Sequence, residues 1–398
     1  MKTETEPARE ERSPAPPGRR RFTFLREALV LPLLALIAAL IIGAVVMVLA
    51  DPDTLREWAS FTRDPGGALS ATWELVGGAY EALFRSSLGS TNAISETLVA
   101  TTPLLLAGLS VALAFRAGLF NIGAEGQSLL GIMFGAYVGF TFDLPLVLHL
   151  PAALIAGFAG GALWGAIPGW FKAKTGAHEV ITTIMLNFIA VNLVTYMLKS
   201  TLFQRAGRTD PISKQVDTTA QLPQLGDYRV HLGIVVALLM AFAVWWLLFR
   251  TTVGFRFRAV GANPHAASYA GMSVGATYIG SMAIAGGLSG LAGTTNLLGI
   301  TYSVTPGFLG YGFDAIALAL LGRTHPAGVV LAAILFGALR AGSVGMQAAT
   351  SIPVDIIVVI QALIIMFVAA PALVREIFRV RAAPTTGPAE TFTKSWAG

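Results

Sequence analysis

A short segment between two long apolar runs, RAVGANPHAASYAGMSVG at 258–275, has the residues of a tightly capped helix. Asn263 is a good N-cap, and Pro264 suits the first helical position because its missing N–H would be unsatisfied there in any case. Gly271 can supply the left-handed residue that stops the helix. The pattern predicts about two helical turns, from Pro264 to Ala270.

A helix this short is marginal on its own in water, so it must pack on its own chain or dock on another protein. The small side chains of Ala266, Ala267 and Ala270 would permit close docking. Arg258 and Arg256 could pair with acidic groups of a partner, or could simply mark the cytoplasmic side of a membrane. The positions expected to set the shape and contacts of this segment are Arg258, Gly261, Asn263, Pro264, Ala266, Ala267 and Gly271.

A second group of candidates consists of polar and aromatic residues within or beside apolar runs, where polar groups are costly and often functional. The amide of Asn187, with Thr183 before it, could bind a sugar hydroxyl or a base edge, or could equally join two helices. Glu125 could cap the following helix rather than touch a substrate. The candidates for a substrate pathway are Asn187, Thr183, Asn121, Gln127, Tyr302 and Phe308.

Arg340 lies near the middle of an apolar run, where insertion of an arginine costs roughly 2.5–3.5 kcal/mol. It therefore needs a partner, and the candidates are Asp314 and Gln361. We favour a structural pairing over direct contact with substrate.

No catalytic or metal constellation accompanies these residues. The chain has no cysteine and only five histidines, which are scattered along it, and no Gly-Lys dipeptide of a phosphate-binding loop. The sequence therefore predicts no enzyme activity and no cofactor in this chain. If ATP drives its function, another subunit binds the ATP and Mg²⁺.

The elements that position these residues are membrane helices. The chain of 398 residues is 55% hydrophobic and 12% charged, with a mean hydropathy of +0.68, which indicates a polytopic membrane protein. Its net charge of +5 comes from basic residues beside apolar runs, so we do not expect nucleic-acid binding.

Because helices of about 20 residues satisfy their own backbone polar groups in lipid, we predict an all-α fold. The ten spans expected are 28–50, 97–115, 126–142, 144–171, 179–198, 230–249, 274–299, 304–321, 327–349 and 352–374, the eighth of them a candidate re-entrant segment.

With both termini in the cytoplasm, 18 Lys and Arg fall on the cytoplasmic side and 8 outside, which follows the positive-inside rule. Residues 1–27 are then a disordered cytoplasmic tail, 28–375 the membrane domain and 376–398 a second cytoplasmic tail. The segments 51–96 and 199–229 are the long external loops. Glycines at 157, 161, 165 and 169 predict close helix packing. Two similar glycine-rich segments, 106–131 and 286–322, suggest an inverted repeat.

Four motifs together resemble the permeases of bacterial ABC importers of the branched-chain amino acid and simple-sugar group. They are RAVGANPHAASYAGMSV, FRAGLFNIGAEGQSLLG at 115–131, HEVITTIMLNFIAVNL at 178–193 and GYGFDAIALALLGRTHPAG at 310–328. The resemblance covers roughly 95–375. The phrases EVITTIMLN and FNIGAEGQ are most similar to nucleoside-type permeases that work with a basic-membrane-protein-like lipoprotein.

This resemblance implies a multi-pass subunit of the bacterial cytoplasmic (inner) membrane, embedded in lipid. Its implied partners are two cytoplasmic ABC ATPase subunits, a second permease chain and an external substrate-binding lipoprotein. The segment 250–273 would be the coupling loop, whose helix sits in a cleft of the ATPase. The cargo stays open among nucleosides, simple sugars and branched-chain amino acids. An ion-coupled secondary transporter and a passive facilitator are the alternatives.

Overall fold

The computed structural model describes residues 17–350, 352–353, 355–369 and 377–379. Helices dominate this part of the chain, and it contains two isolated β-bridges but no strand. The α-helices are α1 (Pro17–Ala50), α2 (Pro52–Ala59), α3 (Pro65–Leu88), α4 (Thr91–Arg116), α5 (Ala124–Thr141), α6 (Leu146–Thr175), α7 (Glu179–Leu198), α8 (Gly233–Arg250), α9 (Thr252–Ala262), α10 (Pro264–Tyr269), α11 (Val274–Asn296), α12 (Tyr311–Leu321), α13 (Pro326–Thr350) and α14 (Asp355–Ala369). A 3₁₀ turn, η1 (Thr218–Ala220), and a π-helical turn, η2 (Leu297–Thr301), complete the set.

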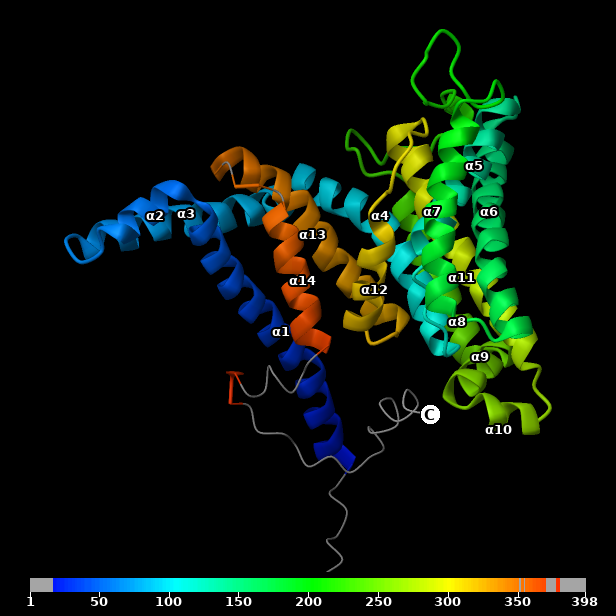
Figure 1. The fold of residues 1–398 in the computed structure, drawn as a ribbon, viewed down its shortest axis with the longest axis horizontal. Coiled ribbons are helices and arrows are strands. Elements are labelled where there is room, and N and C mark those ends of the chain that lie inside the picture. The colour runs from blue at the N-terminus through cyan, green and yellow to red at the C-terminus, as the bar shows by residue number, and fades with distance from the viewer. Residues whose placement is uncertain (1–16, 351, 354, 370–376, 380–398) are drawn as a thin grey trace, which may run out of the picture. The chain divides into compact units, whose positions relative to one another are not determined.

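Two compact units make up the chain, one of Met1–Ile42 with Ala362–Gly398 and the other of Gly43–Gln361. The larger unit holds every candidate site residue. Within it, α9 and α10 lie at one end of the long helices, and the loop between α7 and α8 lies at the other (Figure 1). We call these the α10 end and the opposite end.

Seven helices of the described chain are long and apolar enough to cross a membrane: α1 from Leu33, α4, α6, α7, α8, α11 with η2, and α13. The all-helical membrane fold is therefore confirmed, but the count of ten spans is not. The eighth expected span is helical only over α12, which at about 1.5 Å per residue is too short to cross a bilayer. The orientation of the termini stays a prediction.

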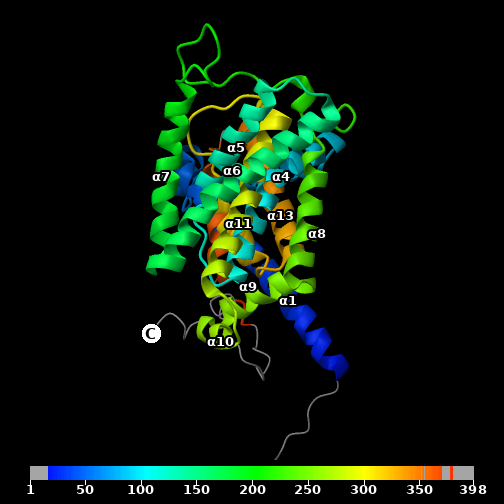
Figure 2. The same cartoon turned by 90° about the vertical axis from the view of Figure 1, so that its right-hand side faces the viewer.

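The glycine ladder of α6 makes the close helix packing that was expected, and its partner is α11. A Cβ on Gly165 would stand 2.9 Å from the Gly286 Cα, and one on Gly161 would stand 2.7 Å from the Gly290 Cα. Because no side chain fits between these backbones, the two helices approach closely. α7 and α8 lie on either side of this central pair in Figure 2.

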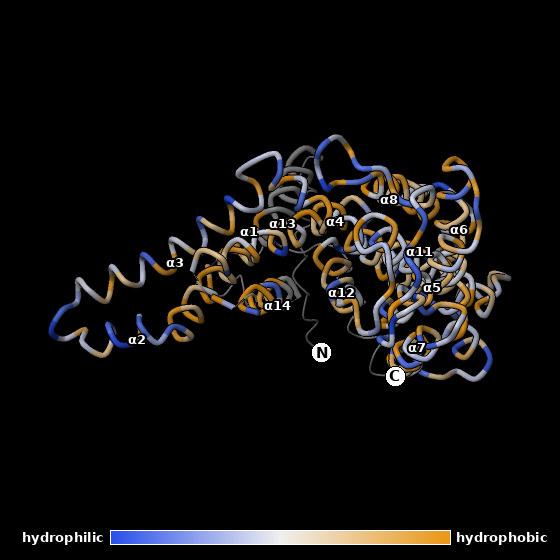
Figure 3. The backbone as a smooth tube through the Cα atoms, turned by 90° about the horizontal axis from the view of Figure 1, so that it is seen from above, coloured by the Kyte–Doolittle hydropathy of each residue, from blue (hydrophilic) through white to orange (hydrophobic). Residues whose placement is uncertain are grey.

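Two segments that were expected to lie outside the membrane spans without helical structure are helical in the structure. Residues 17–27, expected to be part of a disordered tail, belong to α1, and residues 1–16 and 380–398 lie outside the described residues. The segment 51–96, expected to be an external loop, forms α2, α3 and the start of α4. Hydrophilic residues gather at the turn between α2 and α3 (Figure 3), and Asp51 and Asp64 cap the two helices.

Candidate functional site: a capped helix and a buried junction

The segment 263–271 has the local shape that its sequence predicts. The Asn263 side chain accepts a hydrogen bond from the Ala266 N–H at 3.0 Å, and Pro264 is the first residue of α10. Gly271 has φ +79°, a conformation that costs a residue without a Cβ little. The helix ends at Tyr269, one residue earlier than predicted, with Ala270 as its C-cap.

The orientation of α10 corrects the expectation that its alanines form one docking surface. Ala267 is only 4% exposed, so it packs inward on its own chain, whereas Ala266 and Ala270 are exposed. Tyr269 is 94% exposed, more than any other large hydrophobic residue of the described chain. Sequence reasoning missed Tyr269, although a lone aromatic ring among small residues of a short helix was a visible signal.

The backbone at Gly261, near the end of α9, packs directly against the turn after α4. A Cβ on Gly261 would meet the Arg116 carbonyl oxygen and stand 2.8 Å from the Gly118 nitrogen. Gly118 itself has φ +76°. The contact requires glycine at both 118 and 261, because a side chain on either would meet the other's backbone. It holds α9, the helix that leads into α10, in place.

Arg258 does not pair with an acidic residue of the described chain. Its guanidinium lies 5.3 Å from the centre of the Phe249 ring, and its Nε is buried without a hydrogen-bond partner in that chain. Arg116 lies over the same ring at 5.7 Å and donates from Nε to the Thr324 carbonyl at 3.0 Å. The His325 ring stands 5.4 Å from Phe249. The base of the coupling segment is thus packed against α4, α8 and the loop before α13.

Three of the predicted pathway residues meet around the turn between α4 and α5. The Asn121 and Gln127 amides donate to each other at 2.8 and 3.0 Å, and Asn121 also donates to the Ser110 hydroxyl at 3.2 Å. Asn187 of α7 accepts from the Gly126 N–H and donates to the Ile122 carbonyl, both at 2.9 Å. These amides are at most 3% exposed.

In this structure the three amides support the turn, which is the helix-joining alternative for Asn187. Thr183 is fully buried and donates to the Glu179 carbonyl of its own helix at 2.7 Å. Contact of these four residues with a substrate stays a prediction.

Glu125, in the first turn of α5, binds the start of a different helix. Its carboxylate accepts from the backbone N–H groups of Leu309, Gly310 at 2.9 Å and Gly312 at 2.8 Å. The residue is 1% exposed. It therefore caps α12 rather than α5, and it links the two glycine-rich segments that the sequence paired. We call the contact of residues 119–127 with the backbone of 309–312 the buried junction.

Of the two partners that the sequence suggested for Arg340, the structure selects Asp314. Arg340 Nη1 lies 3.8 Å from Asp314 Oδ2, and the Arg340 guanidinium lies 5.3 Å from the centre of the Tyr311 ring. Phe308 contacts Phe188 edge to face at 5.8 Å between ring centres. Tyr302 has φ +52° and donates to the Gly299 carbonyl at 3.1 Å; no interaction links it to Phe308.

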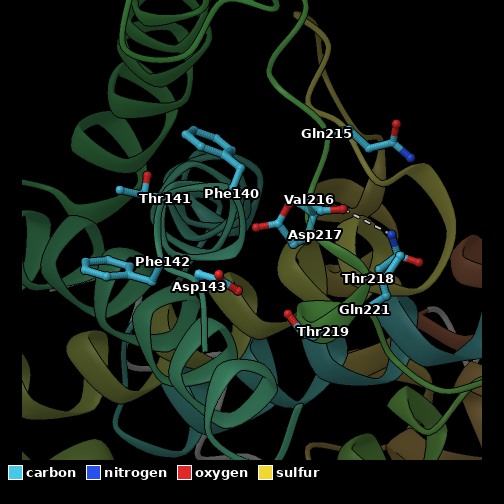
Figure 4. Close-up of a pocket in the computed structure, with 10 residues that line it drawn as sticks. All are labelled: Phe140, Thr141, Phe142, Asp143, Gln215, Val216, Asp217, Thr218, Thr219 and Gln221. Atoms are coloured by element: carbon cyan, nitrogen blue, oxygen red, sulfur yellow. Dashed lines mark hydrogen bonds between the residues drawn. The ribbon is translucent and has the colours of Figure 1, made fainter. Parts of the chain in front are cut away.

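A polar cavity of about 780 Å³ opens at the opposite end, and the sequence did not indicate it. Its lining comes from the end of α5 and from the loop between α7 and α8, and includes the Asp143 and Asp217 carboxylates. Gln221 donates to the Val216 carbonyl at 3.1 Å beside it (Figure 4). None of the predicted site residues lines it.

Comparisons with known proteins identify the family of this chain. Residues 93–369 match the family described as branched-chain amino acid transport system, permease component. The guanosine ABC transporter permease protein NupP of Bacillus subtilis is 41% identical over 87% of this chain and 94% of its own length. The nucleoside ABC transporter permease protein NupB of Lactococcus lactis is 36% identical over 86% and 91%. The glucose ABC transporter permease protein TsgB13 of Haloferax volcanii is 34% identical over 84% and 86%.

No solved structure matches the chain. The family match covers most of the residues described above, including both the capped helix and the buried junction. The chain therefore belongs to the family of permease components of branched-chain amino acid transport systems.

Proposed function

We propose that this chain is a transmembrane subunit of an ATP-driven importer that moves nucleosides, or simple sugars, inward across the bacterial cytoplasmic membrane. The family match supports the permease role. Two relatives named for guanosine and nucleosides, and one named for glucose, support the cargo class. Branched-chain amino acids appear in the name of the family but in none of these three relatives.

The observation that carries the proposal is the shape of α10. A short helix can transmit a push only if its base is fixed and its outer face is free. The Asn263 cap and the inward Ala267 fix the helix, while the Gly261 contact and the Arg258–Phe249 packing fix its base. The exposed Tyr269 and Ala266 are then available to a cytoplasmic ATPase, which binds the ATP and Mg²⁺.

This assignment places the α10 end in the cytoplasm, together with both termini. The opposite end, with the loop between α7 and α8, then faces outward and meets an external substrate-binding lipoprotein. A second permease subunit completes the pathway. ATP binding drives closure of the ATPase pair, α10 follows that movement, and its rigid base passes the movement to α4, α8 and the loop before α13.

The test is uptake of labelled guanosine and glucose by the assembled transporter in proteoliposomes, with and without internal ATP. We expect uptake only with ATP. Tyr269→Arg should reduce uptake at least fivefold with unchanged membrane insertion, because it places bulk and charge on the docking face. Trp73→Arg is the matched control, since Trp73 is 78% exposed on α3, which is not among the seven candidate membrane helices.

Two outcomes contradict the proposal. Uptake by the isolated chain under an ion gradient, without ATPase subunits, would favour the secondary transporter. Normal ATP-driven uptake by Tyr269→Arg would remove α10 from the coupling path.

A further inference from the structure

Two charged residues are partly exposed deep inside the membrane region of this chain. Arg340 stands roughly 21 Å along α13, at about 1.5 Å per residue, and its side chain is 43% exposed. The Asp314 side chain, on the half-length helix α12, is 29% exposed. A charge facing hydrocarbon is costly, and intramembrane charges almost always face the bundle interior or a water-filled cavity. This surface is therefore a poor candidate for a lipid-facing surface.

The Arg340–Asp314 ion pair also leaves hydrogen-bonding groups unused. The two charged groups are 3.8 Å apart, and the Arg340 guanidinium makes no hydrogen bond within the described part of the chain. The guanidinium lies over the ring of Tyr311. Several N–H donors and carboxylate lone pairs thus stay available to water or to a polar solute.

Aromatic rings lie on the neighbouring surface. Phe188 and Phe308 are 54% and 53% exposed, although the two rings contact each other edge to face. Phe308 directly precedes the N–H groups that Glu125 holds, so its backbone is fixed. Gly310 connects the aromatic pair to the ion pair. It lies two residues after Phe308, and a Cβ on it would stand 3.8 Å from Arg340 Nη2.

We propose that this surface, defined by Phe188, Phe308, Asp314 and Arg340 and called here the α12 face, lines the aqueous pathway and contacts the permeating solute. Exposed rings beside a few convergent polar groups suit a neutral cyclic solute with hydroxyl groups, because the rings stack on its apolar face while the ion pair orients the hydroxyls. This inference rests on the proposed function, since the cargo class comes from it.

The complete absence of cysteine permits a direct test by single-cysteine labelling. Phe313→Cys reports on the border of the α12 face, and Leu331→Cys on another side of the neighbouring helix α13; the native residues are 65% and 66% exposed. Each variant is assembled with its partner subunits in membranes and treated with a membrane-impermeant methanethiosulfonate from both sides. We expect Phe313→Cys to react at least tenfold faster than Leu331→Cys, and guanosine to slow that reaction.

Equal reaction rates at the two positions would overturn the inference, as would protection of Phe313→Cys in the assembled transporter without any solute. The second result would mean that the α12 face packs dry against the second permease. Labelling does not require transport. A tenfold contrast without ATP-driven uptake would refute the proposed function alone, and ATP-driven uptake without the contrast would refute this inference alone.

A double variant separates a pathway role from a structural one. Arg340→Gln with Asp314→Asn removes both charges together and leaves no unpaired ion in the membrane. We expect normal assembly and thermal stability but a KM for guanosine uptake raised about tenfold. The matched control is Arg229→Gln with Glu96→Gln, an ion pair at the opposite end with side chains 59% and 30% exposed. An unchanged KM in the first double variant would assign its ion pair to structure only.

Discussion

The capped helix α10 and the buried junction solve the same problem, unsatisfied N–H groups at the start of a helix, by opposite means. In α10 the acceptor is the Asn263 side chain, three residues from the Ala266 N–H that it binds. At α12 the acceptor is the Glu125 carboxylate, 185 positions from the Gly310 N–H. The first solution follows from neighbouring residues, and the second exists only in the folded chain. Loss of the Asn263 cap should therefore destabilise the protein only slightly, whereas loss of the Glu125 carboxylate should destabilise it strongly.

The largest effect is expected from Glu125→Ala. This change leaves three N–H groups near the start of α12 without their acceptor, and each buried unsatisfied group costs about 1–3 kcal/mol. We expect poor recovery of folded protein and no uptake, measured by size-exclusion chromatography in detergent and by thermal unfolding. Glu74→Ala, at an exposed position of α3, should have little effect. Wild-type stability of Glu125→Ala would refute the role of the carboxylate in holding α12.

Gly161→Ala should come next, because its methyl group would meet the Gly286 carbonyl oxygen and the Gly290 backbone. Overpacking of this kind costs typically 1–3 kcal/mol. The thermal midpoint should fall, and uptake should fall with it. Gly280→Ala on α11 is the control, since a Cβ there meets nothing within 4 Å; equal midpoints for the two variants would contradict the close α6–α11 packing.

Asn263→Ala should have a smaller effect on stability, because loss of an N-cap costs about 1 kcal/mol and α10 is one short helix. The global midpoint should stay near the wild-type value, while ATP-driven uptake falls severalfold because α10 frays. Asn263→Asp should restore uptake, since its carboxylate is an equally good cap. Failure of Asp to rescue would indicate that the amide itself is needed for another contact.

The smallest effect concerns His325, in the loop that packs under the coupling segment. Burial, and then the nearby Arg116, lower the pKa of this histidine below 6.5. The folded state therefore resists its protonation, so its contribution to stability is present above pH 6.5 and declines as the pH falls below that value. His325→Gln should make the thermal midpoint slightly less sensitive to acidification between pH 7 and 5. An unchanged pH profile would exclude this effect.

Sequence reasoning predicted the features that depend on neighbouring residues or on regular spacing. The span 179–198 coincides with α7, and the glycines of α6 form a packing face. The cost of an isolated charge in an apolar run predicted a partner for Arg340, with Asp314 and Gln361 as the candidates, and the structure selects Asp314. In contrast, α3 was missed because its sequence mixes Trp73, Glu74 and Arg85 with apolar residues, so that no uncharged run marks it.

The amides of Asn121, Gln127 and Asn187 show why candidate pathway residues are difficult to assign from sequence. Their residue types and location suit solute binding as well as helix joining. The structure brings them together around one turn and satisfies them there. Conversely, Phe188 was not singled out by its sequence, and it stands beside Phe308 on the exposed α12 face.

By itself, the sequence determined that this chain is a helical membrane protein, where most of its long helices run, and that a capped two-turn helix follows Arg258. These features depend on hydrophobic runs, glycine spacing and cap residues, whose effects reach only a few positions along the chain. Only the tertiary structure decided that Ala267 faces inward, that Glu125 caps α12, and that Arg340 and Asp314 lie on an exposed face. Those outcomes depend on which helices become neighbours, because burial and partnership are properties of packing across distant segments.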